Sequence, residues 1–302
     1  MKYNFKELAI IGPTASGKSD LALKIAKKTD AYILSIDSLS IYKEVDIVSA
    51  KPSKDELSQT KHFGIDEIYI DEYFSVDIFI SLYKKVKDIC IRDAKNLVIV
   101  GGTSFYLKSL IEGLSPIPSL NLDAKTNIAK AMQNPQDTYN FLMLKDKAYM
   151  SKISPNDSYR IEKALIIFEG SKLTPTEWFK QNRPQAIIKN LPIFNIDVAR
   201  NTLRERISLR TNRMLKMGLI DEVCYLESKY TREPNAIKSI GIVEVLEYLD
   251  GKVTKEMMLS NISTHTAQLA KRQQTFNKNQ FTNLISAPLE KLEGKILSFT
   301  AN

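Results

Sequence analysis

The chain has 302 residues, of which 43% are hydrophobic and 26% charged; these ordinary values exclude a mainly disordered protein. Lys and Arg outnumber Asp and Glu by 43 to 35, and the net charge of +8 favours a polyanionic partner. No stretch approaches the roughly 18 apolar residues of a membrane span, and the N-terminus lacks the apolar core of a signal peptide. We therefore expect a cytoplasmic protein that does not bind membranes.

The first predicted strand, Leu8–Ile11, leads through a glycine-rich loop into a helix over 19–28. The loop matches the phosphate-binding pattern G-x-x-x-x-G-K-[ST]. Its glycines allow backbone N–H groups to surround a phosphate, Lys18 adds a charge, and Ser19 is a predicted Mg²⁺ ligand. The pattern leaves the phosphate compound open. The predicted phosphate-binding residues are Gly12, Pro13, Thr14, Ala15, Ser16, Gly17, Lys18 and Ser19.

A second predicted strand, Ala31–Ile36, ends in Asp37 and Ser38. In a parallel sheet, a carboxylate at this strand end would face the phosphate loop and act as a catalytic group. The alternative is a helix cap, since Asp-Ser is common capping chemistry. The position at the strand end favours catalysis.

The third predicted strand, Leu97–Val100, ends in Gly101, Gly102 and Thr103. Many P-loop nucleotidases have an aspartate here that organises magnesium, so its absence argues against an ordinary ATPase. The Thr103 hydroxyl is placed to bond a phosphate oxygen, although a tight strand-to-helix turn would use the same residues. Helices predicted at Ser53 and Ser75 separate the strands, and this alternation predicts an α/β fold: a P-loop NTPase-like parallel sheet flanked by helices.

From Leu114 onwards helix-like segments continue without a clear strand until Leu191. We predict an inserted helical domain over 116–186, with the P-loop catalytic core formed by 1–115 and 187–302. The segment 192–198 returns to the sheet, and the chain beyond it is expected to be helical. Trp178 is expected to anchor the inserted domain.

A helix beginning near Leu203 places Arg206, Arg210 and Arg213 on one face. Solvated arginine stripes are common, but beside a phosphate loop in a basic chain the stripe predicts an anion or RNA contact. Cys90 and Cys224 are expected to be reduced core thiols. His62 and His265 have no metal-ligand spacing around them, and we assign them no catalytic role.

The phosphate loop, Asp37–Tyr42, Ser49–Pro52 and Val100–Thr103 together resemble, in order and spacing, the bacterial tRNA dimethylallyltransferases of the IPP transferase family. Later segments agree, including Pro155-Asn156-Asp157, Met217-Gly218-Leu219 and the run Gln268–Gln273. The resemblance covers nearly the whole chain. The chain departs from the family pattern at Lys61-His62-Phe63, Gly241-Ile242 and Ala267.

The resemblance implies transfer of a dimethylallyl group from dimethylallyl diphosphate to the exocyclic amine of the adenosine that follows the anticodon in tRNA. It implies Mg²⁺ as cofactor, the tRNA anticodon arm as partner and a monomeric enzyme. Asp37 would accept the proton of the adenine amine, and Thr103 and Arg206 would contact the diphosphate. The implied tRNA-binding residues are Asp37, Ser38, Leu39, Ser40, Thr103, Lys125, Tyr159, Arg160, Ile161, Glu162, Lys163 and Arg210.

Two other functions fit parts of the pattern. A P-loop small-molecule kinase would also place an aspartate near the end of the second strand. An RNA-binding module with a regulatory nucleotide site would account for the charge, but it leaves the pair of Asp37 and Thr103 without a role.

Overall fold

The computed structural model describes residues 5–301, and the chain divides into two compact units. The core unit comprises Met1–Ile111 and Ile188–Asn302, and the helical lobe comprises Glu112–Ile187. The range expected from the sequence for an inserted domain, 116–186, lies within the helical lobe.

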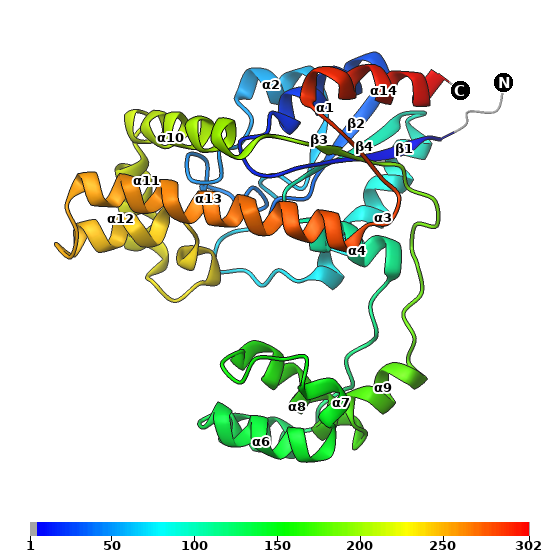
Figure 1. The fold of residues 1–302 in the computed structure, drawn as a ribbon, viewed down its shortest axis with the longest axis vertical. Coiled ribbons are helices and arrows are strands. Elements are labelled where there is room, and N and C mark those ends of the chain that lie inside the picture. The colour runs from blue at the N-terminus through cyan, green and yellow to red at the C-terminus, as the bar shows by residue number, and fades with distance from the viewer. Residues whose placement is uncertain (1–4, 302) are drawn as a thin grey trace. The chain divides into compact units, whose positions relative to one another are not determined.

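The core unit contains a six-stranded sheet in which every pair of neighbouring strands is parallel (Figure 1). The order is β3-β2-β4-β1-β5-β6, so the strand that carries the phosphate loop lies between β4 and β5. The strands are β1 (Glu7–Ile11), β2 (Ala31–Ser35), β3 (His62–Phe63), β4 (Asn96–Gly101), β5 (Ile193–Ile196) and β6 (Leu284–Ala287).

The prediction that the chain is only helical beyond residue 198 was wrong, because β6 adds a strand at the sheet edge. This strand has four residues, and Ile285 in its middle is 36% exposed. An edge strand of this kind has neither the length nor the continuous apolar run that marks the buried strands.

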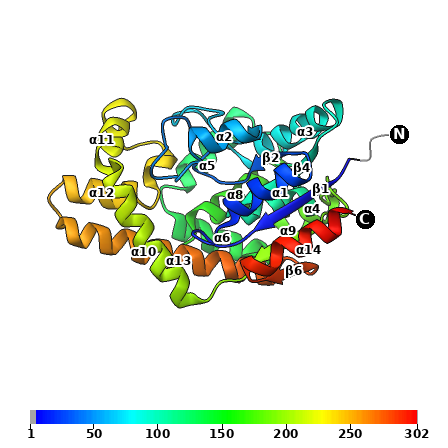
Figure 2. The ribbon, with the colours of Figure 1, turned by 90° about the horizontal axis from the view of Figure 1, so that it is seen from above.

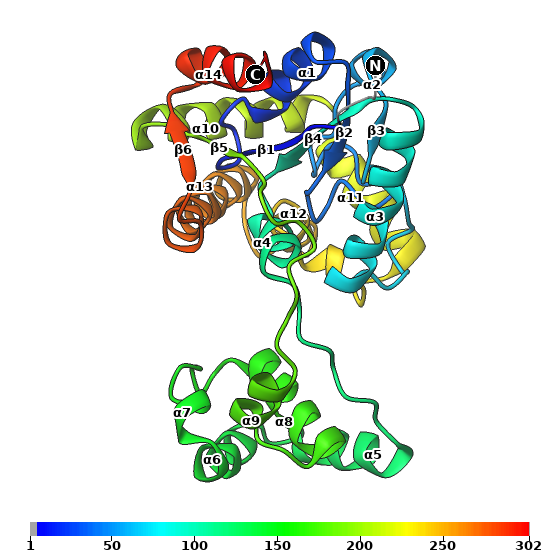
Figure 3. The ribbon, with the colours of Figure 1, turned by 90° about the vertical axis from the view of Figure 1, so that its right-hand side faces the viewer.

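Helices cover both faces of the sheet (Figure 3). On one face α1 (Lys18–Lys28) and α14 (Leu289–Ala301) pack against alternate strand residues such as Ile10, Ile33 and Phe194. On the other face lie α3 (Val76–Arg92), which buries Phe79 and Cys90, and α4 (Ser104–Glu112). A parallel sheet requires such cover on both sides, and it leaves the carboxyl ends of the strands free for ligands.

Most of the remaining helices of the core unit form a second cluster, with a separate apolar interior (Figure 2). That interior also takes in Val45 and Val48 from the segment after β2. The helices are α10 (Arg200–Lys216), α11 (Leu219–Tyr230), the short 3-10 helix η1 (Asn235–Lys238), α12 (Ile242–Leu249) and α13 (Lys255–Gln280). The short helix α2 (Lys54–Gln59) contributes no residue to this interior. Cys224 on α11 is exposed, so the expectation of two core thiols was correct only for Cys90.

The helical lobe has its own core, which includes the fully buried Leu142 and Ile161. The Trp178 indole donates a hydrogen bond of 2.9 Å to the Pro116 carbonyl and so ties the end of the lobe to its start. The helices are α5 (Leu122–Ala131), α6 (Pro135–Lys145), α7 (Lys147–Met150), α8 (Ser158–Ser171) and α9 (Pro175–Gln181).

The two ends of the helical lobe lie against each other. Gly113 has φ +79°, and a Cβ atom at this position would lie 2.2 Å from the Gln185 carbonyl oxygen. Only glycine permits this approach of two backbones.

Within residues 5–301, no helix has both the length and the apolar character needed to cross a membrane.

Candidate active site

The phosphate loop connects β1 to α1 and is shaped by two residues with positive φ. Gly17, with φ +87°, precedes the first residue of α1, and Ala15 has φ +61°. Lys18 curls back over the loop, where its Nζ donates a hydrogen bond of 3.3 Å to the Pro13 carbonyl. The strand, loop and helix therefore meet as predicted, with backbone N–H groups at the positive end of the α1 dipole.

The Lys18 ammonium lies among both cationic and anionic groups. Burial lowers the pKa of Lys18 to about 8; nearby Asp37 opposes this shift, and Arg210 adds to it. The negative charge of Asp37 does not offset burial and the positive charge of Arg210, so the protonated form of Lys18 is destabilised. A bound anion would stabilise it.

Asp37 follows β2 and faces the phosphate loop at the carboxyl end of the sheet. Its Oδ1 accepts hydrogen bonds from the backbone N–H of Leu39 at 2.9 Å and of Ser40 at 3.3 Å. Asp37 thus shapes a turn with one oxygen, as the capping alternative expected, but no helix begins there. The same side chain lines the cavity that contains Lys18.

Thr103 connects the ends of β2 and β4. Its Oγ1 accepts a hydrogen bond of 3.2 Å from the Ser38 N–H, and its own N–H donates to the Ile36 carbonyl at 3.1 Å. Thr103 also lines the cavity with Asp37 and Lys18, so the structure brings these three predicted residues together.

Gln273, on α13, is a site residue that sequence reasoning missed. Its Oε1 accepts a hydrogen bond of 2.9 Å from the Thr14 N–H, and its Nε2 donates one of 3.0 Å to the Gly102 carbonyl. One side chain therefore joins the phosphate loop to the turn after β4. The helical pattern of α13 does not distinguish Gln273 from its neighbours. The only feature of the sequence that pointed to it was its place in the run Gln268–Gln273, which resembles the family pattern.

The three arginines predicted to share one face of α10 differ in their surroundings. Arg210 lines the cavity and donates a hydrogen bond of 3.0 Å to the Thr14 hydroxyl. Burial lowers the pKa of Arg210, and Asp37 opposes the shift. Arg206 reaches the carbonyl of Ser16 at 3.4 Å from outside the cavity, and Arg213 is exposed.

The cavity has a volume of about 590 Å³ and two chemically different parts. The charged residues of the lining are Lys18, Asp37, Arg210 and Arg272, and Thr14, Gly102 and Gln273 also line the cavity. The other part is apolar and aromatic; it is lined by Tyr42, Phe74, Phe105, Tyr106, Ile207, Met214, Ile240, Ile262, Leu269 and Phe276. Burial raises the pKa of Tyr106 to about 12, so its hydroxyl stays protonated at neutral pH.

A second cavity, of about 90 Å³, shares Lys18, Asp37 and Arg210 with the first and is also lined by Ser19. Within residues 5–301, no group of three or more His, Cys, Asp or Glu side chains is arranged to hold a metal. Beside the phosphate loop, Ser19 supplies a hydroxyl and Asp37 a carboxylate, and Glu56 lines the same cavity. This donor set suits Mg²⁺, which usually keeps several waters and binds through one or two protein groups together with substrate phosphates.

The remaining residues predicted to bind tRNA divide between the two units. Ser38, Leu39 and Ser40 belong to the core unit, where Ser40 is buried at 6% exposure. In the helical lobe Lys125 lies on α5, and residues 159–163 lie in the first turns of α8. Tyr159, Arg160 and Lys125 are exposed. Ile161 is 0% exposed in the core of the lobe, so we no longer expect its side chain to contact RNA.

Together, the fold and the site define a P-loop enzyme whose phosphate loop opens into a largely apolar pocket, rather than onto the acidic metal site of an ATPase. The family model described as IPP transferase matches residues 40–280. The chain belongs to the IPP transferase family.

Relatives agree over the full length. The chain is 66% identical to the tRNA dimethylallyltransferase of Sulfurimonas denitrificans, over 98% of this chain and 99% of that protein. It is 54% identical to the enzyme of the same name from Sulfurovum sp., again over 98% and 99%. Among solved structures, the full-length tRNA isopentenylpyrophosphate transferase of Bacillus halodurans matches with a TM-score of 0.72 and 28% identity, over 99% of this chain and 96% of that one.

Proposed function

We propose that this enzyme transfers a dimethylallyl group from dimethylallyl diphosphate to the exocyclic amine of the adenosine that follows the anticodon of tRNA. The observation that carries the proposal is the two-part cavity, which joins a cationic end at the phosphate loop to an apolar end. A prenyl diphosphate has the same division between a charged head and a hydrocarbon tail. Family membership does not favour the kinase alternative.

In this reaction the adenine nitrogen attacks the first carbon of the dimethylallyl group, and the bond from that carbon to the diphosphate oxygen breaks. The amine loses a proton and diphosphate leaves. Lys18 and Arg210 carry positive charge where the leaving group's negative charge grows, and such fixed charges stabilise a transition state without reorganisation. Arg206 and Thr103 add a guanidinium and a hydroxyl close to the same loop.

Asp37 is the proposed acceptor of the amine proton. Its Oδ1 is held by the N–H groups of Leu39 and Ser40, which fixes the direction of the carboxylate. A base held in place is more effective than one that must find its orientation during the reaction.

Mg²⁺ fits the phosphate end of the site, where Ser19 and Asp37 would hold it together with oxygens of the donor. When bound, it would neutralise charge on the departing diphosphate. The chain itself contributes the ammonium of Lys18 and the orientation of the donor.

The anticodon arm is the proposed partner of Lys125, Tyr159, Arg160, Glu162 and Lys163 on the helical lobe and of Asp37–Ser40 on the core unit. To be reached, the adenosine must leave its stack, which costs a few kcal/mol that phosphate contacts can offset. We also expect the enzyme to act in the cytoplasm, where tRNA is used, and as a monomer.

The test is mass spectrometry of nucleosides from tRNA incubated with the enzyme, dimethylallyl diphosphate and Mg²⁺. The expected product is a dimethylallyl adenosine at the position after the anticodon. Labelled ATP with small hydroxyl acceptors serves as the comparison. Phosphorylated acceptors and unmodified tRNA would replace the transferase proposal with the kinase alternative.

A further inference from the structure

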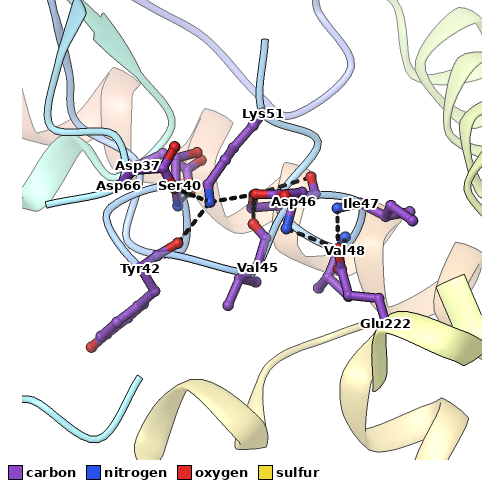
Figure 4. Close-up of polar contacts among 11 residues, drawn as sticks. Asp37, Ser40, Tyr42, Val45, Asp46, Ile47, Val48, Lys51, Asp66 and Glu222 are labelled. Carbon is purple, nitrogen blue, oxygen red and sulfur yellow. Dashed lines mark hydrogen bonds and ion pairs between the residues drawn. The ribbon is translucent and has the colours of Figure 1, made fainter. Parts of the chain in front are cut away.

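Residues 37–52, here called the Asp37 loop, run from the proposed base around the cavity to the start of α2. Ser49 lines both cavities, and Ala50 and Pro52 line the smaller one. Lys51 lines neither, and its side chain points towards Tyr42, Asp46 and Asp66 (Figure 4). The role of Lys51 therefore depends on the groups that its ammonium contacts.

The Lys51 ammonium is surrounded by three oxygen atoms of the protein (Figure 4). It donates hydrogen bonds to the Tyr42 carbonyl at 2.7 Å, to Asp46 Oδ1 at 2.7 Å and to Asp66 Oδ1 at 2.5 Å. The side chain is 5% exposed, whereas those of Asp46 and Asp66 are 66% and 45% exposed. Lys51 thus links the first half of the loop, its tip and the neighbouring segment at Asp66.

Glu222, on α11, holds the tip of the loop from the opposite direction. Its carboxylate accepts three backbone hydrogen bonds, from Asp46 at 2.9 Å, Ile47 at 2.7 Å and Val48 at 2.9 Å. Both side chains bind Asp46 (Figure 4): Lys51 donates to its carboxylate, and its backbone N–H donates to Glu222. Together they form what we call the Lys51–Glu222 clamp.

The loop needs such support, because its backbone is strained. Glu44 and Ala50 have φ +67° and +49°, in a region that residues other than glycine rarely occupy. Strained conformations persist where surrounding contacts over-determine them, and they concentrate at functional sites. Ion pairs with carboxylates as exposed as Asp46 and Asp66 add little net stability, so the clamp is better explained by the conformation it imposes.

The loop conformation sets the direction of Asp37. Two backbone hydrogen bonds join the segment that follows Asp37 to the segment of Asp66. The Asp66 N–H donates to the Ser40 carbonyl at 3.1 Å, and the Glu67 N–H donates to the Ile41 carbonyl at 2.9 Å. Lys51 bonds to both segments, at Tyr42 and at Asp66. Movement at Lys51 would therefore be passed to the turn that orients the carboxylate.

We propose that Lys51 and Glu222 are positioning residues, which hold the Asp37 loop in the one shape that points the Asp37 carboxylate into the cavity. The role assigned to Asp37 rests on the proposed function; the shape of the loop does not. Neither residue of the clamp lines the two cavities of the site.

The test is a double-mutant cycle with Lys51→Met and Asp37→Asn, measured as single-turnover prenyl transfer. Lys51→Met should lower the transfer rate by about 10²-fold, the effect of a displacement near 1 Å in a reacting group, and leave the KM for the donor nearly unchanged. In the Asp37→Asn background it should have little further effect, because residues acting as a unit are not additive. Lys51→Arg should restore part of the rate.

Lys87→Met is the matched control, since Lys87 also binds a carboxylate, Glu7 at 2.8 Å, and a tyrosine hydroxyl but lies away from the loop. Its rate should equal that of the parent. Glu222→Gln, which keeps the size of the side chain, provides a second variant of the clamp should Lys51→Met fail to fold.

Hydrogen exchange gives a readout that does not depend on activity. Amide exchange should rise in residues 37–50 of Lys51→Met or Glu222→Gln and stay unchanged in β4. Unchanged exchange in the loop, a parental transfer rate, or an equal loss of rate in the parent and Asp37→Asn backgrounds would each overturn the proposal. A parent enzyme without prenyl transfer would refute the proposed function, and the exchange comparison would then decide whether the clamp holds the loop.

Discussion

Arg210 Nη1 donates a hydrogen bond of 3.0 Å to the hydroxyl of Thr14, a residue 196 positions earlier in the chain. The contact attaches α10 to the phosphate loop and directs one arginine of the helix towards the cavity. Arg206 is also bonded to the phosphate loop, whereas Arg213 stays exposed. Two of the three arginines on the face predicted to contact an anion or RNA, Arg206 and Arg210, therefore bond to the phosphate loop.

Asp37→Asn tests the proposed base. The amide oxygen of asparagine can still accept the hydrogen bonds from Leu39 and Ser40, so the turn and the melting temperature should be retained. The transfer rate at saturating tRNA and donor should fall by about 10²- to 10⁴-fold, as expected when a positioned general base is lost. A single-turnover measurement beside a thermal melt gives both values, and a near-parental rate would remove Asp37 from the mechanism.

Lys18→Met should have opposite effects on activity and on stability. Prenyl transfer should fall by about 10²-fold or more, because a positioned stabiliser of the leaving group is lost, whereas tRNA affinity should be retained. Without ligands, the variant should melt at a higher temperature than the parent at neutral pH, because the parent buries an ammonium. Loss of tRNA binding in parallel with activity would contradict this division of roles.

The lowered pKa of Lys18 predicts how both properties change with pH. The folded enzyme loses this charge as the pH rises through about 8, while a lysine in the unfolded chain titrates near 10.5. Donor kcat/KM should therefore decline above pH 8, and Lys18→Arg should abolish that decline. Between pH 8 and 10.5 the unfolded chain binds more protons, so the contribution of Lys18 to the free energy of unfolding rises with pH. The stability advantage of Lys18→Met should shrink over this range.

Gln273→Met should weaken the link between the phosphate loop and the turn after β4. The Thr14 N–H and the Gly102 carbonyl both lose their hydrogen-bond partner in this variant. Leaving a buried polar group without a partner costs about 1–3 kcal/mol. An increase of this size in the activation free energy corresponds to a roughly tenfold to hundredfold loss of donor kcat/KM. The control is Gln274→Met, on the same helix, which removes a bond of 3.2 Å to the Val198 carbonyl outside the cavity. Equal losses in both variants would assign the effect to α13 as a whole.

Lys163→Ala tests the proposed RNA contact of the helical lobe. Lys163 lies on α8 with its ammonium 5.3 Å from the centre of the Tyr159 ring, a pairing of charge and aromatic surface that suits nucleic acid. Affinity for an anticodon stem-loop should fall, and the slope of log affinity against log salt should drop by about 1. Arg232→Gln, which removes a cation bound to Glu227 and Asp250 in the core unit, should leave the slope unchanged.

The sequence predicted the parts of the fold that depend on local pattern. The phosphate loop and the first three long strands were identifiable, because a buried parallel strand is a continuous apolar run that ends at a loop residue with special chemistry. The capping box at Ser53 and the helix start at Ser75 were likewise confirmed, since both depend on residues three positions apart.

Features that depend on contacts between distant parts of the chain could not be predicted from local sequence patterns. Gln273 bonds to residues 259 and 171 positions away, and Lys51 acts through groups brought together only by the fold of its loop. Ile161 was expected to bind tRNA because its neighbours do in the family pattern, yet it faces the interior of the lobe. A stretch of neighbouring residues on a helix cannot all face the same ligand.

The close approach of Gly113 and Gln185 has a consequence for how this chain can be modified or could have arisen. The first and last residues of the helical lobe lie with their backbones in contact at Gly113 and Gln185. If the lobe were removed, a very short linker could therefore join the two ends of the core unit. One segment could therefore be exchanged between relatives together with its proposed RNA contacts, while the chemistry of the host enzyme stays the same.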